Sequence, residues 1–213
     1  MYLQTGLNKD YRIGDISNNG IDDIILSYIH DMDVHRMGLV IRDQKGLYHS
    51  PGSDNLEIHS REALHMEQVL GRYLCSRDGE DFVRYVTNQR GKEFVEIKGI
   101  GAGDLGESTV AAILMNDTEG ILLANYNGLP FEERVSQMAR QYNVSNDSLR
   151  NYVITHELAH AAGNRTEESC EGFVKEFYQH QAENAATLEK KTEYLSLANI
   201  AENREKQAKE ANQ

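Results

Sequence analysis

Residues 151–163, with the sequence NYVITHELAHAAG, constrain the fold more than any other stretch of the chain. They contain one HExxH motif, in which His156 and His160 lie four residues apart. On an α-helix this spacing places both imidazoles on one face, one turn apart, so their ring nitrogens can bind the same metal ion. Leu149, Val153 and Ile154 indicate an amphipathic helix around the motif. The stretch therefore predicts a helix that presents half of a zinc site.

The acidic residue of the motif predicts a catalytic role. Glu157 lies about 100° around the helix from His156. From there it cannot easily join the same tetrahedron of ligands, but it can reach a water molecule at the open position of a metal site. That water is the expected nucleophile, and Glu157 is the expected general base.

A catalytic zinc site needs a third protein ligand, and the following segment supplies candidates. Gly163 suits the end of the first helix, and Thr166 is a favourable N-cap for a second helix. Acidic residues in the first turn of that helix suit the positive end of its dipole. Because the connection is short, the second helix returns beside the first. It can thereby bring Glu167, Glu168 or Glu171 over the histidines, and the spacing alone leaves these three open.

HELAH and the segment EESCEGF that follows it resemble the gluzincin zinc peptidases, over about residues 109–180 at most. In that family the helix after HExxH carries a ligand glutamate, then an acid four residues on, then an aromatic residue. The resemblance implies Zn²⁺ held by His156, His160 and Glu167, with Glu171 orienting one histidine. It also implies a peptide or protein substrate. The small minigluzincins are closest in scale to this region.

Two features depart from the gluzincin pattern. The gap between His160 and Glu167 is shorter than is usual in the family, which keeps the other two acids open as ligands. Gly163 also fits the metzincin form HExxHxxGxx(H/D), but that form would place its third ligand at Thr166. The metzincin methionine turn follows the motif, whereas the last methionine here is Met138. The gluzincin interpretation is therefore the stronger one.

Charge and cysteine content exclude several classes of function. The chain of 213 residues has 34 acidic and 22 basic residues and a net charge of −12, so neither nucleic acid nor a membrane surface is an expected partner. No apolar run approaches a membrane span and the first residues lack signal-peptide features, so a cytoplasmic location is expected. Cys75 and Cys170 are too few for a disulfide framework. Cys170 is expected to be a small buried residue rather than a thiolate ligand.

The pattern predicts an α+β chain in three parts. Residues 1–104 form an N-terminal α+β domain of unknown role. Residues 105–180 form a zincin-like catalytic domain with a small antiparallel sheet, the HExxH helix and the glutamate helix. Residues 181–213 form a helical tail that is regulatory or frayed. The boundary rests on the sequence GIGAGDLG at 99–106, interpreted as a hinge rather than a nucleotide-binding loop.

Local patterns predict the remaining elements. Helices are expected at residues 21–29, 54–75 and 131–142, and hairpins at 37–49, 81–100 and 109–127. Strand 121–127 is the candidate to pair with an extended substrate. Asn146 or Asp147 is expected to cap the HExxH helix, and Tyr178 or His180 is a candidate donor to an oxyanion.

These patterns together favour a zinc-dependent peptidase. The alternative from another class is a non-catalytic zinc-containing module, whose residues 1–104 engage a partner. A third possibility is a nucleotide-binding protein built on the glycine-rich segment. The sequence predicts no oligomeric state.

Overall fold

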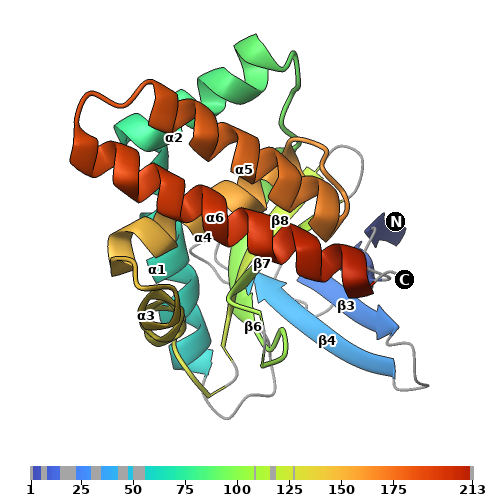
Figure 1. Cartoon of the computed structure of the whole chain (residues 1–213). Coiled ribbons are helices and arrows are strands. Elements are labelled where there is room, and N and C mark those ends of the chain that lie inside the picture. Colours follow the sequence, from blue (N-terminus) through green and yellow to red (C-terminus); the bar gives the residue numbers. More distant parts are fainter. Residues whose placement is uncertain are drawn as a thin grey trace. The chain divides into compact units, whose positions relative to one another are not determined.

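The computed structural model describes residues 2–5, 9–14, 23–29, 35–42, 48–49, 56–107, 109–115, 119–126 and 128–211. Over these residues the chain has an α+β fold with six α-helices and eight strands (Figure 1). Its contacts divide it into two compact units, residues 1–71 with 95–131 and residues 72–94 with 132–213. The first unit holds the sheet, and the second holds the HExxH helix.

The sheet has the strand order β1-β2-β3-β4-β5-β6-β8-β7. The strands are β1 (Tyr2–Thr5), β2 (Lys9–Gly14), β3 (Asp23–Ile29), β4 (His35–Arg42), β5 (Tyr48–His49), β6 (Glu96–Gly103), β7 (Ala111–Met115) and β8 (Glu119–Asn125). β6 runs parallel to both β5 and β8, and the other pairs are antiparallel. The predicted hairpins at 37–49 and 109–127 are confirmed, but the sheet is mixed rather than antiparallel.

β8 is an internal strand. It pairs with β6 on one side and with β7 on the other, so that Leu122 lies opposite Ile100 and Ile113. Its residues Ile121–Asn125 are buried. Both edges of the strand are therefore occupied, and the prediction that it accepts an extended substrate is wrong.

The glycine-rich segment forms the end of β6 and a loop fixed by Asn125. The buried Asn125 side chain accepts a hydrogen bond from the Leu105 backbone N–H (2.9 Å) and donates to the backbone oxygens of Gly106 and Thr109. The strand β7 follows this loop, whereas a dinucleotide site needs a helix N-terminus there. The segment therefore lacks the element that would bind a phosphate, and the predicted domain boundary near residue 104 falls inside the first unit.

Two predicted elements are wrong. The sequence predicts a helix at residues 21–29; the described part of that range, residues 23–29, forms β3, which is hydrogen-bonded between β2 and β4. Residues 81–89, expected as the first half of a hairpin, are helical: α2 (Arg77–Arg84) continues into a π-helical turn, η1 (Tyr85–Gln89). In the first case strand pairing overrides the apolar spacing, and in the second helical packing overrides the β-propensity of the side chains.

The helices other than α2 occur close to where they are expected. They are α1 (Leu56–Leu74), α3 (Phe131–Tyr142), α4 (Asn146–Ala161), α5 (Glu167–Glu183) and α6 (Leu188–Ala211). The cap of α4 is Ser145, whose hydroxyl accepts a hydrogen bond from the Ser148 backbone N–H at 3.0 Å, and not Asn146 or Asp147. No described helix is both long and apolar enough to cross a membrane.

The core of the second unit joins α2, α5 and α6. The Phe82 ring of α2 meets the Phe177 ring of α5 edge-on, at 5.0 Å between ring centroids. α6 lies antiparallel along α5 (Figure 1) and buries Tyr194, Leu197 and Ile200. The first half of α6 is therefore packed rather than frayed.

Candidate metal centre

A tight turn connects α4 to α5 and brings the start of α5 beside α4. Gly163 has a φ of +90°, a left-handed conformation that glycine adopts without strain, and its N–H donates to the His160 carbonyl at 2.8 Å. The Thr166 hydroxyl then caps α5 by accepting a hydrogen bond from the Ser169 backbone N–H at 3.1 Å. The predictions for Gly163 and Thr166 are confirmed. As a result α5 begins at Glu167, beside the histidine-bearing face of α4.

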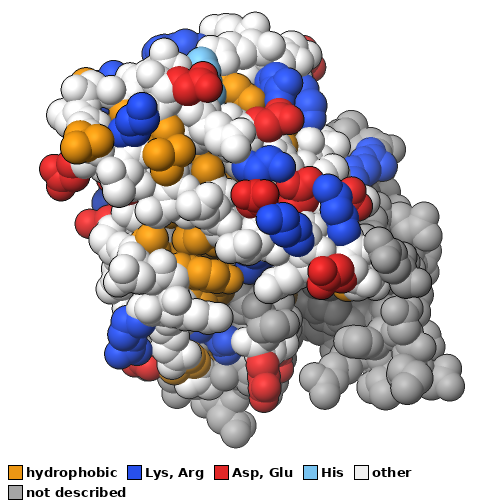
Figure 2. Space-filling model, in the orientation of Figure 1, with side chains coloured by type: hydrophobic (Ala, Val, Ile, Leu, Met, Phe, Trp, Pro, Cys, Tyr) orange, Lys and Arg blue, Asp and Glu red, His pale blue; other side chains and the backbone are white. Residues whose placement is uncertain are grey.

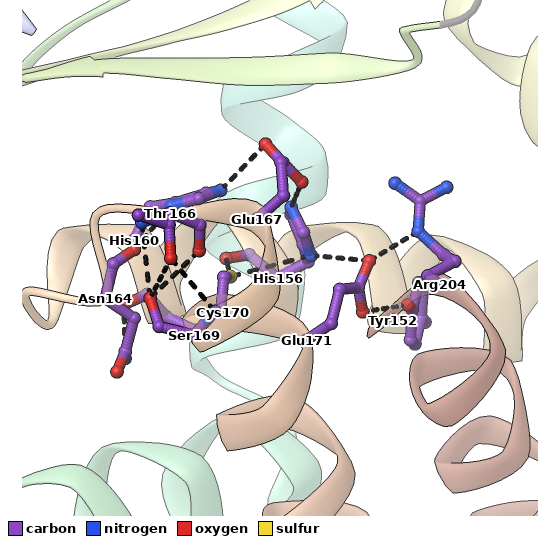
Figure 3. A network of polar contacts seen from close by, with 11 residues as sticks. Tyr152, His156, His160, Asn164, Thr166, Glu167, Ser169, Cys170, Glu171 and Arg204 are labelled. Atoms are coloured by element: carbon purple, nitrogen blue, oxygen red, sulfur yellow. Dashed lines mark hydrogen bonds and ion pairs between the residues drawn. The ribbon is translucent and has the colours of Figure 1, made fainter. Parts of the chain in front are cut away.

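The Glu167 carboxylate lies between the two imidazoles of the motif (Figure 3). One oxygen is 3.3 Å from His156 Nε2 and the other is 3.4 Å from His160 Nε2. The two rings are nearly perpendicular, with an interplanar angle of 84°. Both imidazoles are buried, whereas the Glu167 side chain is 45% exposed. The site is therefore open to solvent on the side of Glu167.

Each of the two Glu167 contacts, one from each carboxylate oxygen, has the length expected between neighbouring ligand atoms of a zinc ion. Nitrogen and oxygen ligands lie about 2.0–2.2 Å from zinc, which puts neighbouring ligand atoms roughly 3.3–3.6 Å apart at tetrahedral angles. Both contacts of Glu167 fall in that range. Two imidazoles and one carboxylate are also a ligand set of catalytic zinc. The three predicted ligands are thus chemically suited to hold the ion.

Among the residues that the structure describes, two groups of side chains could hold a metal ion, and His156 belongs to both. The ligand atoms of His156, His160 and Cys170 lie within 4.8 Å of one another, as do those of His156, Glu167 and Glu171. The predicted set of His156, His160 and Glu167 is not itself one of these groups, because it takes His160 from the first and Glu167 from the second. Which of these side chains suits a metal ion depends on what the Nδ1 atoms of His156 and His160 contact.

The Nδ1 atom of His156 faces Glu171. It lies 3.2 Å from Oε1 of that carboxylate, which is 1% exposed. Arg204 Nε donates to the same oxygen, and the Tyr152 hydroxyl donates to Oε2 at 2.5 Å. Burial alone would raise the pKa of Glu171, but His156, Arg204 and Tyr152 lower it below its ordinary value. Glu171 is therefore an ionised acceptor behind His156.

The Nδ1 atom of His160 is held in a comparable way. It donates to the Asn164 carbonyl at 2.6 Å, and Lys92 Nζ donates to the Asn164 side-chain oxygen at 2.8 Å. The Asn164 amide also donates to the Ala159 carbonyl at 2.8 Å. Both histidines thus direct Nδ1 toward supporting groups and Nε2 toward Glu167. This fixes which nitrogen of each ring is available to a metal.

Cys170 lies on the supporting side of His156. Its thiol is 3.6 Å from Nδ1 and donates to the His156 carbonyl at 3.2 Å. The residue is fully buried in the first turns of α5. In this arrangement Cys170 occupies the small space between α4 and α5.

Without a metal ion, the histidines and acids of the site shift one another's pKa values. Contacts with His156 and His160 hold the pKa of Glu167 well below its ordinary value. Burial alone would lower the pKa of His160, but contacts with Cys170 and Glu167 raise it to about 10. The pKa of His156 is also raised above its ordinary value, because Cys170, Glu167 and Glu171 outweigh its burial. Without metal, the histidines therefore hold protons that a metal ion must displace.

The expected general base, one alternative ligand and the candidate oxyanion donors lie at different places around the site. Glu157 is buried on α4 next to His156. Glu168 is 44% exposed, with its carboxylate 3.9 Å from Lys209 Nζ. The Tyr178 hydroxyl is buried and bonded to Thr155 at 3.0 Å, and His180 contacts Gln89 at 3.3 Å. Neither proposed oxyanion donor is in contact with the ligand residues through these bonds.

Sequence reasoning did not find the residues that support the ligands, which are Tyr152, Lys92, Asn164 and Arg204. For Arg204, the spacing of apolar residues in the sequence could have predicted its position. Leu197, Ile200 and Arg204 lie three and four residues apart, so the arginine continues the buried stripe of α6. For Lys92, 72 residues from its partner, the local sequence contains no comparable signal.

The described residues thus include buried side chains that could hold a metal ion, beside the partly exposed Glu167. Comparison with known protein families, with curated proteins and with solved structures finds no match for the chain. Its function is therefore inferred from the residues and their contacts.

Proposed function

We propose that the protein is a zinc-dependent peptidase. The observation that carries the proposal is the division of the ring nitrogens: both Nε2 atoms face Glu167, and both Nδ1 atoms contact supporting acceptors. A histidine whose Nδ1 donates to a carboxylate or carbonyl is oriented to bind a metal through Nε2. The same arrangement favours Glu171 as a supporting residue rather than a ligand.

The residues of the site have distinct roles in this proposal. His156, His160 and Glu167 would hold zinc, and the exposed side of Glu167 would admit a peptide. Bound zinc supplies a Lewis acid that lowers the pKa of a water molecule and polarises a carbonyl group. Glu157 accepts a proton as water attacks the peptide carbonyl carbon, and then gives that proton to the leaving amine. A carboxylate is required for this exchange.

The substitution Glu157→Gln tests the proposal because it removes the base while preserving the size of the side chain. We expect about one zinc ion per chain in wild type and variant, and a loss of peptide hydrolysis of at least about 100-fold in the variant. Zinc is measured by elemental analysis, and hydrolysis with a broad set of fluorogenic peptides. Glu168→Gln, on the exposed side of α5, is the matched control and should retain both properties.

Unchanged hydrolysis in Glu157→Gln would refute the assigned base. A wild type that takes up no added zinc would refute the metal site and the enzyme together. Stoichiometric zinc without cleavage of any peptide would leave the non-catalytic zinc-containing module as the function.

A further inference from the structure

Glu171 is a buried carboxylate that must be compensated. Its side chain is 1% exposed, and an ionised carboxylate in such a place is costly unless it is paired and hydrogen-bonded. His156 and Tyr152, both on α4, each contact one of its oxygens. The guanidinium of Arg204, on α6, adds a cation. A helix near the C-terminus therefore takes part in stabilising a residue that contacts a ligand histidine.

The position of Arg204 depends on polar contacts between α5 and α6. Beyond Ala201 no described residue of α6 is buried. In this half of α6, Glu205 pairs with Lys175 at 2.5 Å and Lys209 lies 3.9 Å from Glu168. Figure 2 shows basic and acidic side chains interspersed over this end of α6. Ion pairs thus align the last turns of α6 with the first turns of α5, where the site lies.

We propose that Arg204 is a positioning residue of the metal centre, which acts through Glu171 on His156. The inference rests on the proposed zinc site. Arg204 Nε and His156 Nδ1 contact the same oxygen of Glu171, as Figure 3 shows, so the arginine fixes the acceptor that orients the imidazole. The guanidinium also places a positive charge beside the carboxylate that contacts the imidazole. Arg204 thereby couples the docking of α6 to metal affinity.

The neighbouring pair Lys175–Glu205 is a control for a merely structural role. It joins the same two helices at 2.5 Å, and its side chains are partly buried. Neither residue contacts Glu171 or a ligand through a described bond. Lys175→Met should therefore weaken the docking of α6 much as Arg204→Met does, without removing the cation beside Glu171.

The experiment compares zinc dissociation constants of the full chain, measured by competition with a chromophoric chelator. Arg204→Met should bind zinc about 10- to 100-fold more weakly than wild type, as is typical when the partner of a ligand histidine is disturbed. Arg204→Lys, which keeps a cation, should recover part of the affinity. Lys175→Met should stay within about threefold of wild type, since it leaves the partners of His156 in place. The visible absorption of Co²⁺-loaded protein should change in Arg204→Met and not in Lys175→Met.

Wild-type zinc affinity in Arg204→Met, or an equal loss in Lys175→Met, would overturn the proposal. If Arg204→Met lacks the helical circular dichroism of wild type, Arg204→Gln replaces it. This variant keeps a donor to Glu171 but removes the cation, and its zinc affinity should be lower than that of wild type and of Arg204→Lys. A wild type that binds zinc but cleaves no peptide would refute only the peptidase. A wild type without zinc would refute both.

Discussion

Glu167 and Glu168 are neighbours in the first turn of α5, yet their carboxylates have different surroundings. Glu167 contacts the Nε2 atoms of two buried histidines, whereas Glu168 lies near Lys209 on the surface. The difference arises from the helix, which turns successive side chains by about 100°. A single residue position thus separates a candidate ligand from a solvated acid.

Alanine substitutions at these two positions test the assignment of the third ligand. Glu167→Ala should weaken zinc binding by more than about 100-fold, because it removes a ligand rather than the partner of one. Glu168→Ala should bind zinc like wild type. Zinc retained after dialysis, measured by elemental analysis, distinguishes the two. Loss of zinc with Glu168→Ala and retention with Glu167→Ala would reverse the assignment.

At this scale the sequence identified the residues that a short helical connection brings together. The spacing of His156 and His160 and the caps around Gly163 and Thr166 are local features, and the structure has them as expected. The partners of the Nδ1 atoms could not be predicted in the same way. Arg204 lies 33 residues from Glu171, and the contact depends on how α6 packs.

At the scale of elements, the start of α2 packs closely against the end of α1. A Cβ atom added at Gly79 would lie 2.0 Å from the Tyr73 carbonyl oxygen and 3.0 Å from the Leu74 Cα atom. These are backbone atoms, which cannot move without shifting a helix. By contrast, a Cβ atom at Gly71, within α1, would meet no atom within 4 Å.

Gly79→Ala should therefore destabilise the protein by about 1–3 kcal/mol or more, the range found for overpacked sites. Gly71→Ala is the matched control and should be neutral or stabilising by up to about 1 kcal/mol, because alanine is the better helix former. Urea unfolding followed by circular dichroism measures both. Equal stability of the two variants would show that α2 does not pack against the Tyr73 carbonyl as described.

The wrong element predictions have identifiable causes. Phe82, Tyr85 and Val86 favour a strand by residue type, but their spacing of three and four residues is helical, and Phe82 packs against Phe177 in that form. Ser76 also caps α2 by accepting a hydrogen bond from the Gly79 N–H at 3.1 Å, a start signal that the strand interpretation overlooked. For β3 the deciding contacts are backbone pairings with β2 and β4, which local spacing does not encode.

At the scale of the whole molecule, the α+β class followed from the order of helical and strand patterns, while the topology did not. The sheet joins strands from residue 2 to residue 125, across the boundary expected near 104. The parallel pairing of β6 with β8 requires a crossover, and its register is set by contacts between distant segments. Propensity and turn signals contain no information about that pairing.

The shifted pKa values predict how the stability of the metal-free protein depends on pH. The pKa of His160 is raised from 6.5 to about 10, so its contribution is complete below pH 6.5 and is lost as the pH rises through about 10. The pKa values of Glu171 and Glu205 are lowered from 4.5. Their contributions are therefore complete above pH 4.5 and are lost on acidification. Metal-free protein should be most stable between these limits.

Melting temperatures with a chelator and with excess zinc test this at about pH 6 and pH 8.5. Without metal, the melting temperature should be lower at the higher pH. The increase on adding zinc should be larger there, because fewer protons compete for the imidazoles. His160→Gln should reduce the pH dependence of the metal-free protein. A metal-free protein that is more stable at the higher pH would contradict the protonated histidine pair.

The short turn between α4 and α5 also affects the unfolded chain. His156, His160 and Glu167 span only 12 residues, so they stay within one short loop when the rest of the fold is lost. Whatever affinity this loop retains for zinc subtracts from the stabilisation that the ion gives the native state. If these residues hold zinc as proposed, such local ligands would let the ion organise the α4–α5 hairpin early in folding. Arg204, more than 30 residues further along, can improve the site only after α6 has docked.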